Sequence, residues 1–97
     1  MATAEREAAE RRLQDLVELI RRSPAGRDHD AELLQEAEAL GRAIAAFHLE
    51  GIRFRFYNLD RLMTQSAAAL PPDAAGILAD VRRHLEAAGF HTRSHSM

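Results

Sequence analysis

Apolar residues in the first part of the chain recur at steps of three and four positions. From Ala4 to Arg22 they form a single narrow stripe, made of Ala9, Leu13, Leu16, Val17 and Ile20. This period is typical of an amphipathic helix, and the narrow stripe indicates contact with one neighbour. Ser23-Pro24 and Gly26 end the pattern, and the short link after them predicts an antiparallel hairpin with the next helix.

The central stretch from His29 to Ser66 contains no proline and carries two apolar stripes. One follows the helical period through Leu34, Ala37, Gly41, Ala45, His48, Ile52, Phe56, Leu59 and Met63. The other is spaced by sevens, at Leu33, Leu40, Phe47 and Phe54. Because each apolar face of a helix needs a neighbour to cover it, two stripes indicate two neighbours. We therefore predict one long central helix, covered on one side by the first helix.

Residues 52–56 allow a second interpretation. They read Ile-Arg-Phe-Arg-Phe, and this strict alternation is the period of a half-buried strand. Five residues make a short strand, the flanking residues keep the helical period, and no second strand is available to pair with it. We keep the helix, expect a bend at Gly51, and leave the strand as the alternative.

Pro71-Pro72 ends the central element, and a third helix is predicted from Pro72 or Asp73 to Ala88. Its stripe consists of Ile77, Leu78, Val81 and Leu85. Gly89 followed by Phe90 predicts a left-handed C-terminal cap.

The fold class is therefore all-α, with three helices in the order short, long, short. We expect a single domain over residues 1–90 and a polar, flexible tail at 91–97.

Composition favours self-association. Only 5% of the residues are aromatic and tryptophan is absent, so the core is built largely from aliphatic residues and alanine. Small cores of this kind commonly need a partner subunit. The acids of the central stretch gather between Asp28 and Glu38, and its arginines between Arg53 and Arg61. Two antiparallel copies would set acid against base, although the helix macrodipole favours the same distribution in a single helix.

We therefore predict a helical-bundle homodimer whose twofold axis lies near Phe47 and His48. Small residues at successive i+4 steps of the central helix would permit close approach of the two copies. The predicted dimer seam consists of Ala37, Gly41, Ala45, Ile52 and Phe56.

Charge and residue usage exclude several classes of partner and chemistry. The net charge is −2, which argues against nucleic acid even though all thirteen basic residues are arginine. No cysteine is present, so disulfides and thiolate chemistry are excluded. The first residues lack the apolar stretch of a secretory signal, and no apolar run approaches the length of a membrane span. We expect a cytoplasmic protein with no membrane partner.

Candidate chemistry is sparse. No catalytic residues are predicted, and we expect neither a cofactor nor a metal, because His91 and His95 follow the predicted helix stop at Gly89. Enzyme activity is not favoured. The expected function is a non-enzymatic interaction or regulatory module that self-associates through its central helix, with a further protein partner that the sequence does not identify. The alternative is a small enzyme or ligand sensor with an arginine-lined pocket at the dimer interface, lined by Arg42, His48, Arg53, Arg55 and Tyr57.

Overall fold

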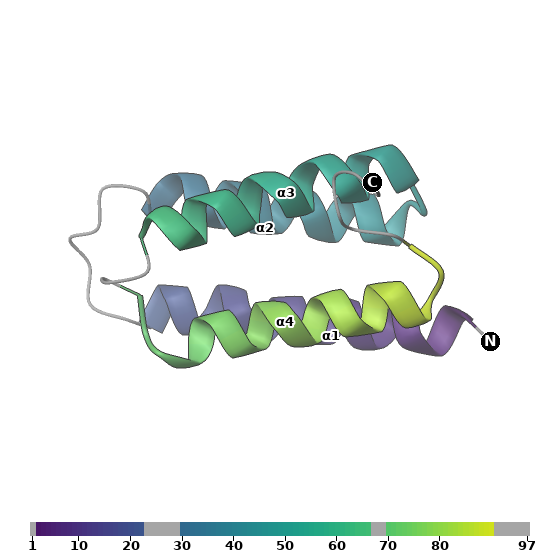
Figure 1. Ribbon diagram of the computed structural model, residues 1–97, viewed down its shortest axis with the longest axis horizontal. Helices are drawn as coiled ribbons and strands as arrows, with labels where there is room; N and C mark the ends of the chain where they lie inside the picture. Colours follow the sequence, from purple (N-terminus) through teal and green to yellow (C-terminus); the bar gives the residue numbers. More distant parts are fainter. Residues whose placement is uncertain (1, 23–29, 67–69, 91–97) are drawn as a thin grey trace.

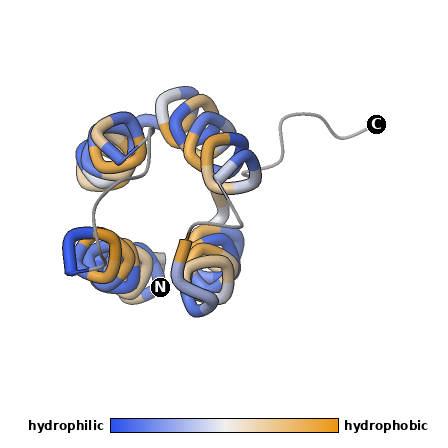
Figure 2. Tube along the Cα trace, turned by 90° about the vertical axis from the view of Figure 1, so that its left-hand side faces the viewer, coloured by the Kyte–Doolittle hydropathy of each residue, from blue (hydrophilic) through white to orange (hydrophobic). Residues whose placement is uncertain are grey.

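The computed structural model describes residues 2–22, 30–66 and 70–90, and it is all-helical over these ranges. In chain order the helices are α1 (Ala2–Arg22), α2 (Asp30–Ala45), α3 (Leu49–Gln65) and α4 (Asp73–Ala87). They run lengthwise beside one another (Figure 1) and stand around a common centre when seen end-on (Figure 2). Helix α1 packs against α4 and α2, and α2 packs against α3. The all-α fold class is confirmed.

The prediction of three helices with one long central helix is wrong, because the central stretch forms two helices. α2 ends at Ala45 and α3 begins at Leu49. Phe47 has a φ of 56°, in the left-handed region, and its N–H donates to the carbonyl of Ile44 at 3.1 Å. The N–H of His48 donates to the carbonyl of Ala43 at 3.0 Å. This is the bonding pattern that usually ends a helix at glycine, and here a phenylalanine adopts it.

The other expectations for the centre are settled by the same turn. The chain reverses at residues 46–48, so the bend lies before Gly51, which falls within the first turn of α3. Residues 52–56 belong to α3, and the described ranges contain no strand. Ile52 and Phe56 are therefore one helical turn apart on a single buried face.

The core confirms the helical stripes predicted for the two ends of the chain. Every residue of the first stripe and of the last stripe is buried. The central residues divide differently, because α3 folds back on α2 and the two helices cover each other. Leu33, Leu40 and Ile44 are buried, whereas Phe47 and Phe54 from the spacing of seven are exposed.

The predicted ends of α4 are confirmed. Pro72 is its N-cap and Ala88 its C-cap, and Gly89 has a φ of 97°. The N–H of Phe90 donates to the carbonyl of Leu85 at 2.9 Å, and the N–H of Gly89 donates to Glu86 at 3.0 Å. Together these bonds make the predicted glycine cap. The first link and the tail at 91–97 lie outside the described residues.

Candidate interaction surface

The large apolar side chains that the described structure leaves exposed all lie in one short segment. They belong to α3 and the turn before it, with exposed fractions of 55% for Phe47, 41% for Leu49, 57% for Phe54 and 49% for Tyr57. Single exposed apolar residues are ordinary on a protein surface, but a group of them marks a candidate interaction site.

Contacts with both neighbouring helices fix the rotation of α3. Its buried face carries Ile52, Phe56, Leu59, Leu62 and Met63. Arg55 Nη1 lies 3.2 Å from Glu36 Oε2 on α2. On another side, Asp60 Oδ2 lies 3.6 Å from Arg82 Nη2 on α4. The remaining side of α3 points away from the rest of the molecule.

Four side chains define this outer face of α3. Its members are all exposed and follow one another at steps of four, three and four: Glu50, Phe54, Tyr57 and Arg61. Such spacing places them in one row along a helix. The row has two aromatic rings in the middle, an acid at the N-terminal end and a base at the C-terminal end. The row therefore combines an apolar middle with opposite charges at its two ends.

Two contacts within α3 involve residues of the outer face. The guanidinium carbon of Arg55 lies 5.1 Å from the centre of the Phe54 ring. Arg53 Nη1 lies 3.9 Å from Glu50 Oε2, but the Glu50 side chain is still 81% exposed. Both the acid and the aromatic ring thus remain accessible to a second molecule.

The Phe47 side chain contacts residues of α1 and of the segment after α4. Its ring lies 6.2 Å from the ring of Phe90 at an angle of 42°. The guanidinium carbon of Arg6 lies 4.5 Å from the centre of the Phe47 ring, and Arg6 also pairs with Glu10 at 3.1 Å. The turn between α2 and α3 therefore contacts both α1 and the segment that follows α4. These contacts fix the position where α3 begins.

The structure does not bring the five predicted pocket residues together. Arg42 lines a groove between α1 and α2, whereas Arg55 pairs with Glu36 at the α2–α3 contact. His48 is the N-cap of α3, and its Nδ1 accepts a hydrogen bond from the N–H of Gly51. Arg53 and Tyr57 belong to α3, and Tyr57 is exposed on the outer face.

The predicted dimer seam falls mostly in the core of the single chain. Ala37, Ile52 and Phe56 are at most 1% exposed, so the chain's own helices already cover them. A Cβ on Gly41 would lie 3.6 Å from Leu13 of α1, so Gly41 faces the contact between α1 and α2. Ala45 is exposed. The buried members of the predicted seam are therefore closed to a second folded copy, whereas Gly41 and Ala45 line the same groove between α1 and α2 as Arg42.

An apolar groove of about 300 Å³ lies between the second half of α3 and the first half of α4. Met63, Leu70 and Leu78 contribute apolar lining, and the Asp60–Arg82 pair also borders it. None of the four residues of the outer face of α3 lines this groove.

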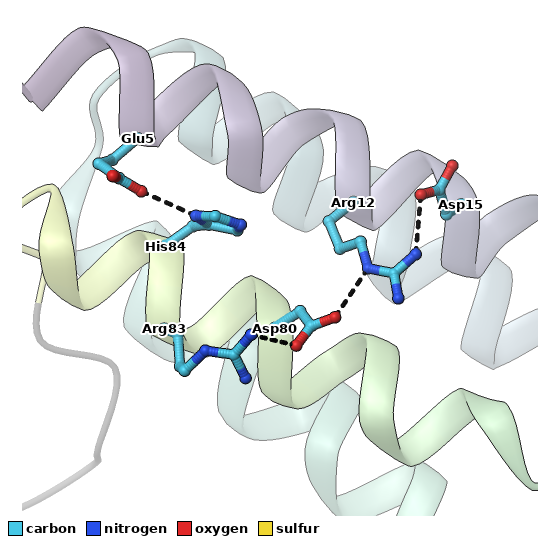
Figure 3. A network of polar contacts seen from close by, with 6 residues as sticks. All are labelled: Glu5, Arg12, Asp15, Asp80, Arg83 and His84. Carbon is cyan, nitrogen blue, oxygen red and sulfur yellow. Dashed lines mark hydrogen bonds and ion pairs between the residues drawn. The ribbon is translucent and has the colours of Figure 1, made fainter.

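A network of charged residues joins α1 to α4 (Figure 3). Arg12 Nε donates to Asp80 Oδ2 at 2.9 Å and Arg12 Nη1 donates to Asp15 at 3.0 Å. Asp80 also pairs with Arg83. The hydrogen bond from Arg12, followed by that from Arg83, lowers the pKa of Asp80 below its ordinary value of 3.8. The hydrogen bonds to Asp15 and Asp80 raise the pKa of Arg12.

Further along the same contact, His84 Nδ1 lies 2.7 Å from Glu5 Oε1 (Figure 3). All six side chains of the network have partners within it. The network therefore acts as a clamp between α1 and α4.

No family model, curated protein or solved structure matches the chain. Over residues 2–22, 30–66 and 70–90, none of the helices combines the length and the apolar character needed to cross a membrane. The same ranges hold no group of three or more acidic or histidine side chains placed to bind a metal ion.

Sequence reasoning singled out Tyr57 but missed Glu50, Phe54 and Arg61. Their spacing was visible, because steps of four and three mark one face of a helix. In a single long helix, however, Phe54 belonged to the stripe expected to be buried. Only the reversal at Phe47 turns this residue to the outside.

Proposed function

We propose that this protein is a non-enzymatic helical interaction module that self-associates as a homodimer. The observation that carries the proposal is the outer face of α3, where Phe54 and Tyr57 are about half exposed on the side opposite the core. Exposed aromatic residues next to arginine are the composition typical of interface centres.

The outer side of α1 differs from that of α3. It exposes polar and charged side chains, including Glu7, Arg11, Gln14 and Glu18. Burial of apolar area is favourable by roughly 25 cal/mol per Å², so the aromatic row of α3 gains more from a partner than the outer side of α1 does. This contrast supports α3 as the contact surface.

Each subunit of the proposed dimer is already folded on its own. The structure has a core of its own, so the second copy is not needed to bury Ile52 or Phe56. We therefore propose an association of two folded subunits, which reversible contacts of modest area can provide.

The scattering of the predicted pocket residues supports a non-enzymatic role over the alternative of an arginine-lined pocket. Arg42 lines the groove between α1 and α2, Arg55 pairs with Glu36 on α2, and the Nδ1 atom of His48 is engaged in capping α3. Arg55 and His48 thus each have a structural role in the single subunit.

Sedimentation equilibrium across a wide range of protein concentrations tests the proposal. We expect a monomer–dimer equilibrium for the wild-type chain and a weaker one for the Phe54→Ala/Tyr57→Ala variant. Arg11→Ala, on the exposed side of α1, is the matched control and should dimerise like the wild type. A folded monomer at every concentration would contradict the proposal.

A further inference from the structure

We infer that the second copy packs antiparallel along the outer face of α3, with the twofold axis crossing the helix between Arg55 and Phe56. The inference rests on the proposed self-association through the outer face of α3 and adds the direction and the register of the contact. It places Phe54 against Tyr57 of the partner subunit and Glu50 against Arg61 of the partner subunit.

The register follows from the spacing of the outer face. Glu50 lies four residues before Phe54, and Arg61 lies four residues after Tyr57. The row is therefore symmetric in position about the point midway between residues 55 and 56. A twofold axis through that point exchanges the acid with the base and one aromatic residue with the other. Each contact then occurs twice, as a twofold symmetric interface requires.

Charge selects the antiparallel direction. If two copies packed parallel about a twofold axis, each Glu50 would meet Glu50 of the partner subunit, and the two Arg61 side chains would meet likewise. Facing like charges disfavour association. The antiparallel arrangement replaces both repulsions with acid–base pairs, and it also aligns the two helix dipoles in opposite directions.

The four side chains are available for these contacts. Glu50 is 81% exposed even with Arg53 nearby. Phe54 and Tyr57 project between the two charges. An aromatic centre flanked by charged pairs resembles the apolar middle and polar rim of protein interfaces. The outer face of α3 is thus complementary to an antiparallel copy of itself, both in the order of its side chains and in its charges.

Charge exchange tests the register. Glu50→Arg and Arg61→Glu should each weaken dimerisation by roughly tenfold, because each places like charges at both ends of the row. The double variant Glu50→Arg/Arg61→Glu should recover the affinity of the wild type, because the pairs form again with exchanged signs. Circular dichroism of each variant checks that the helices are intact. A dimer whose affinity is unchanged by both single exchanges would overturn the inference.

A spin-label distance tests the direction without altering a charge. The chain has no cysteine, so Gln65→Cys provides a unique label on the exposed side of α3. At 1.5 Å rise per residue, the antiparallel register separates the two labels by about 30 Å along the helix. Parallel packing would leave them about 10 Å apart, the usual distance between helix axes. A short distance would overturn the inference.

The outcomes separate the inference from the proposal beneath it. A monomer at all concentrations overturns the proposed self-association and the inference together. A dimer that tolerates both charge exchanges, or that gives the short label distance, overturns only the antiparallel register. Weakening by the single exchanges, recovery in the double variant and the long distance together support it.

Discussion

The Nδ1 atom of His48 accepts a hydrogen bond from the backbone N–H of Gly51 at 2.9 Å, and this contact begins α3. The imidazole can approach so closely because Gly51 has no side chain. A Cβ there would lie 2.7 Å from Nδ1 and 3.3 Å from the Cβ of Ala43. The glycine therefore serves a close approach inside the helix and does not mark the bend.

Replacing this glycine should destabilise the fold even though alanine is the better helix former. Gly51→Ala gains about 1 kcal/mol of helix propensity but displaces the capping imidazole, and a lost cap together with the crowding costs roughly 2 kcal/mol. We expect a net loss of about 1 kcal/mol in the free energy of unfolding, measured by urea denaturation.

Gly76 supplies the matched control. It lies in α4, and a Cβ there would have no neighbour within 4 Å. Gly76→Ala should therefore stabilise the protein by about 0.5–1 kcal/mol. Equal stabilisation by the two substitutions would show that the His48–Gly51 contact does not restrict the site.

The helices at the two ends of the chain could be predicted from the sequence because strong signals bound them. Pro72 and Gly89 mark the two ends of α4, and the structure confirms both. The reversal in the centre carries no such signal. Phe47 is a residue type that rarely adopts positive φ, and His48 is not among the preferred N-cap residues.

The outer face of α3 could be predicted only in part. Phe54 and Phe56 are two positions apart, so a helix places them on different sides. Which of the two is covered depends on where α2 and α4 lie, and this follows only from the reversal at Phe47. The helical spacing in the sequence predicts which side chains share a row. The tertiary contacts determine which row is buried.

The left-handed backbone of Phe47 leads to a second prediction. A non-glycine residue at a φ of 56° costs about 1 kcal/mol, which glycine does not lose. Phe47→Ala removes the ring contacts with Phe90 and Arg6 but keeps the backbone cost. Phe47→Gly removes both. We therefore expect the glycine variant to be more stable than the alanine variant by about 1 kcal/mol in chemical denaturation, and the reverse order would contradict the assigned turn.

The clamp between α1 and α4 should make stability depend on pH. Because the pKa of Asp80 is lowered in the folded state, its carboxylate stabilises the fold above its ordinary value of 3.8. That contribution is lost as the pH falls through the lowered pKa. Asp80→Asn should therefore lower the urea midpoint at neutral pH, and the difference from the wild type should shrink on acidification below that value.

Exposed Glu18 on α1 provides the control for the clamp. Glu18→Gln removes one acid outside the clamp and should leave the neutral-pH midpoint close to that of the wild type. If Asp80→Asn and Glu18→Gln had the same effect at neutral pH, the Arg12–Asp80 contact would have no stabilising role.

Phe54 and Phe56 provide a matched pair that separates folding from association. Phe56 is 1% exposed, and the centre of its ring lies 4.8 Å from the guanidinium carbon of Arg82. Phe56→Ala should therefore lower the free energy of unfolding by about 3–5 kcal/mol. Since small domains are only marginally stable, we expect that variant to lose most of its cooperative thermal transition.

Phe54→Ala should stay within about 0.5 kcal/mol of the wild type in dilute solution, where association adds little. At high concentration the wild type should gain thermal stability and Phe54→Ala should not, because dimerisation stabilises the folded state only when the outer face of α3 is intact. Calorimetry at two concentrations measures both effects, and an equal concentration dependence for the two proteins would place the dimer contact elsewhere.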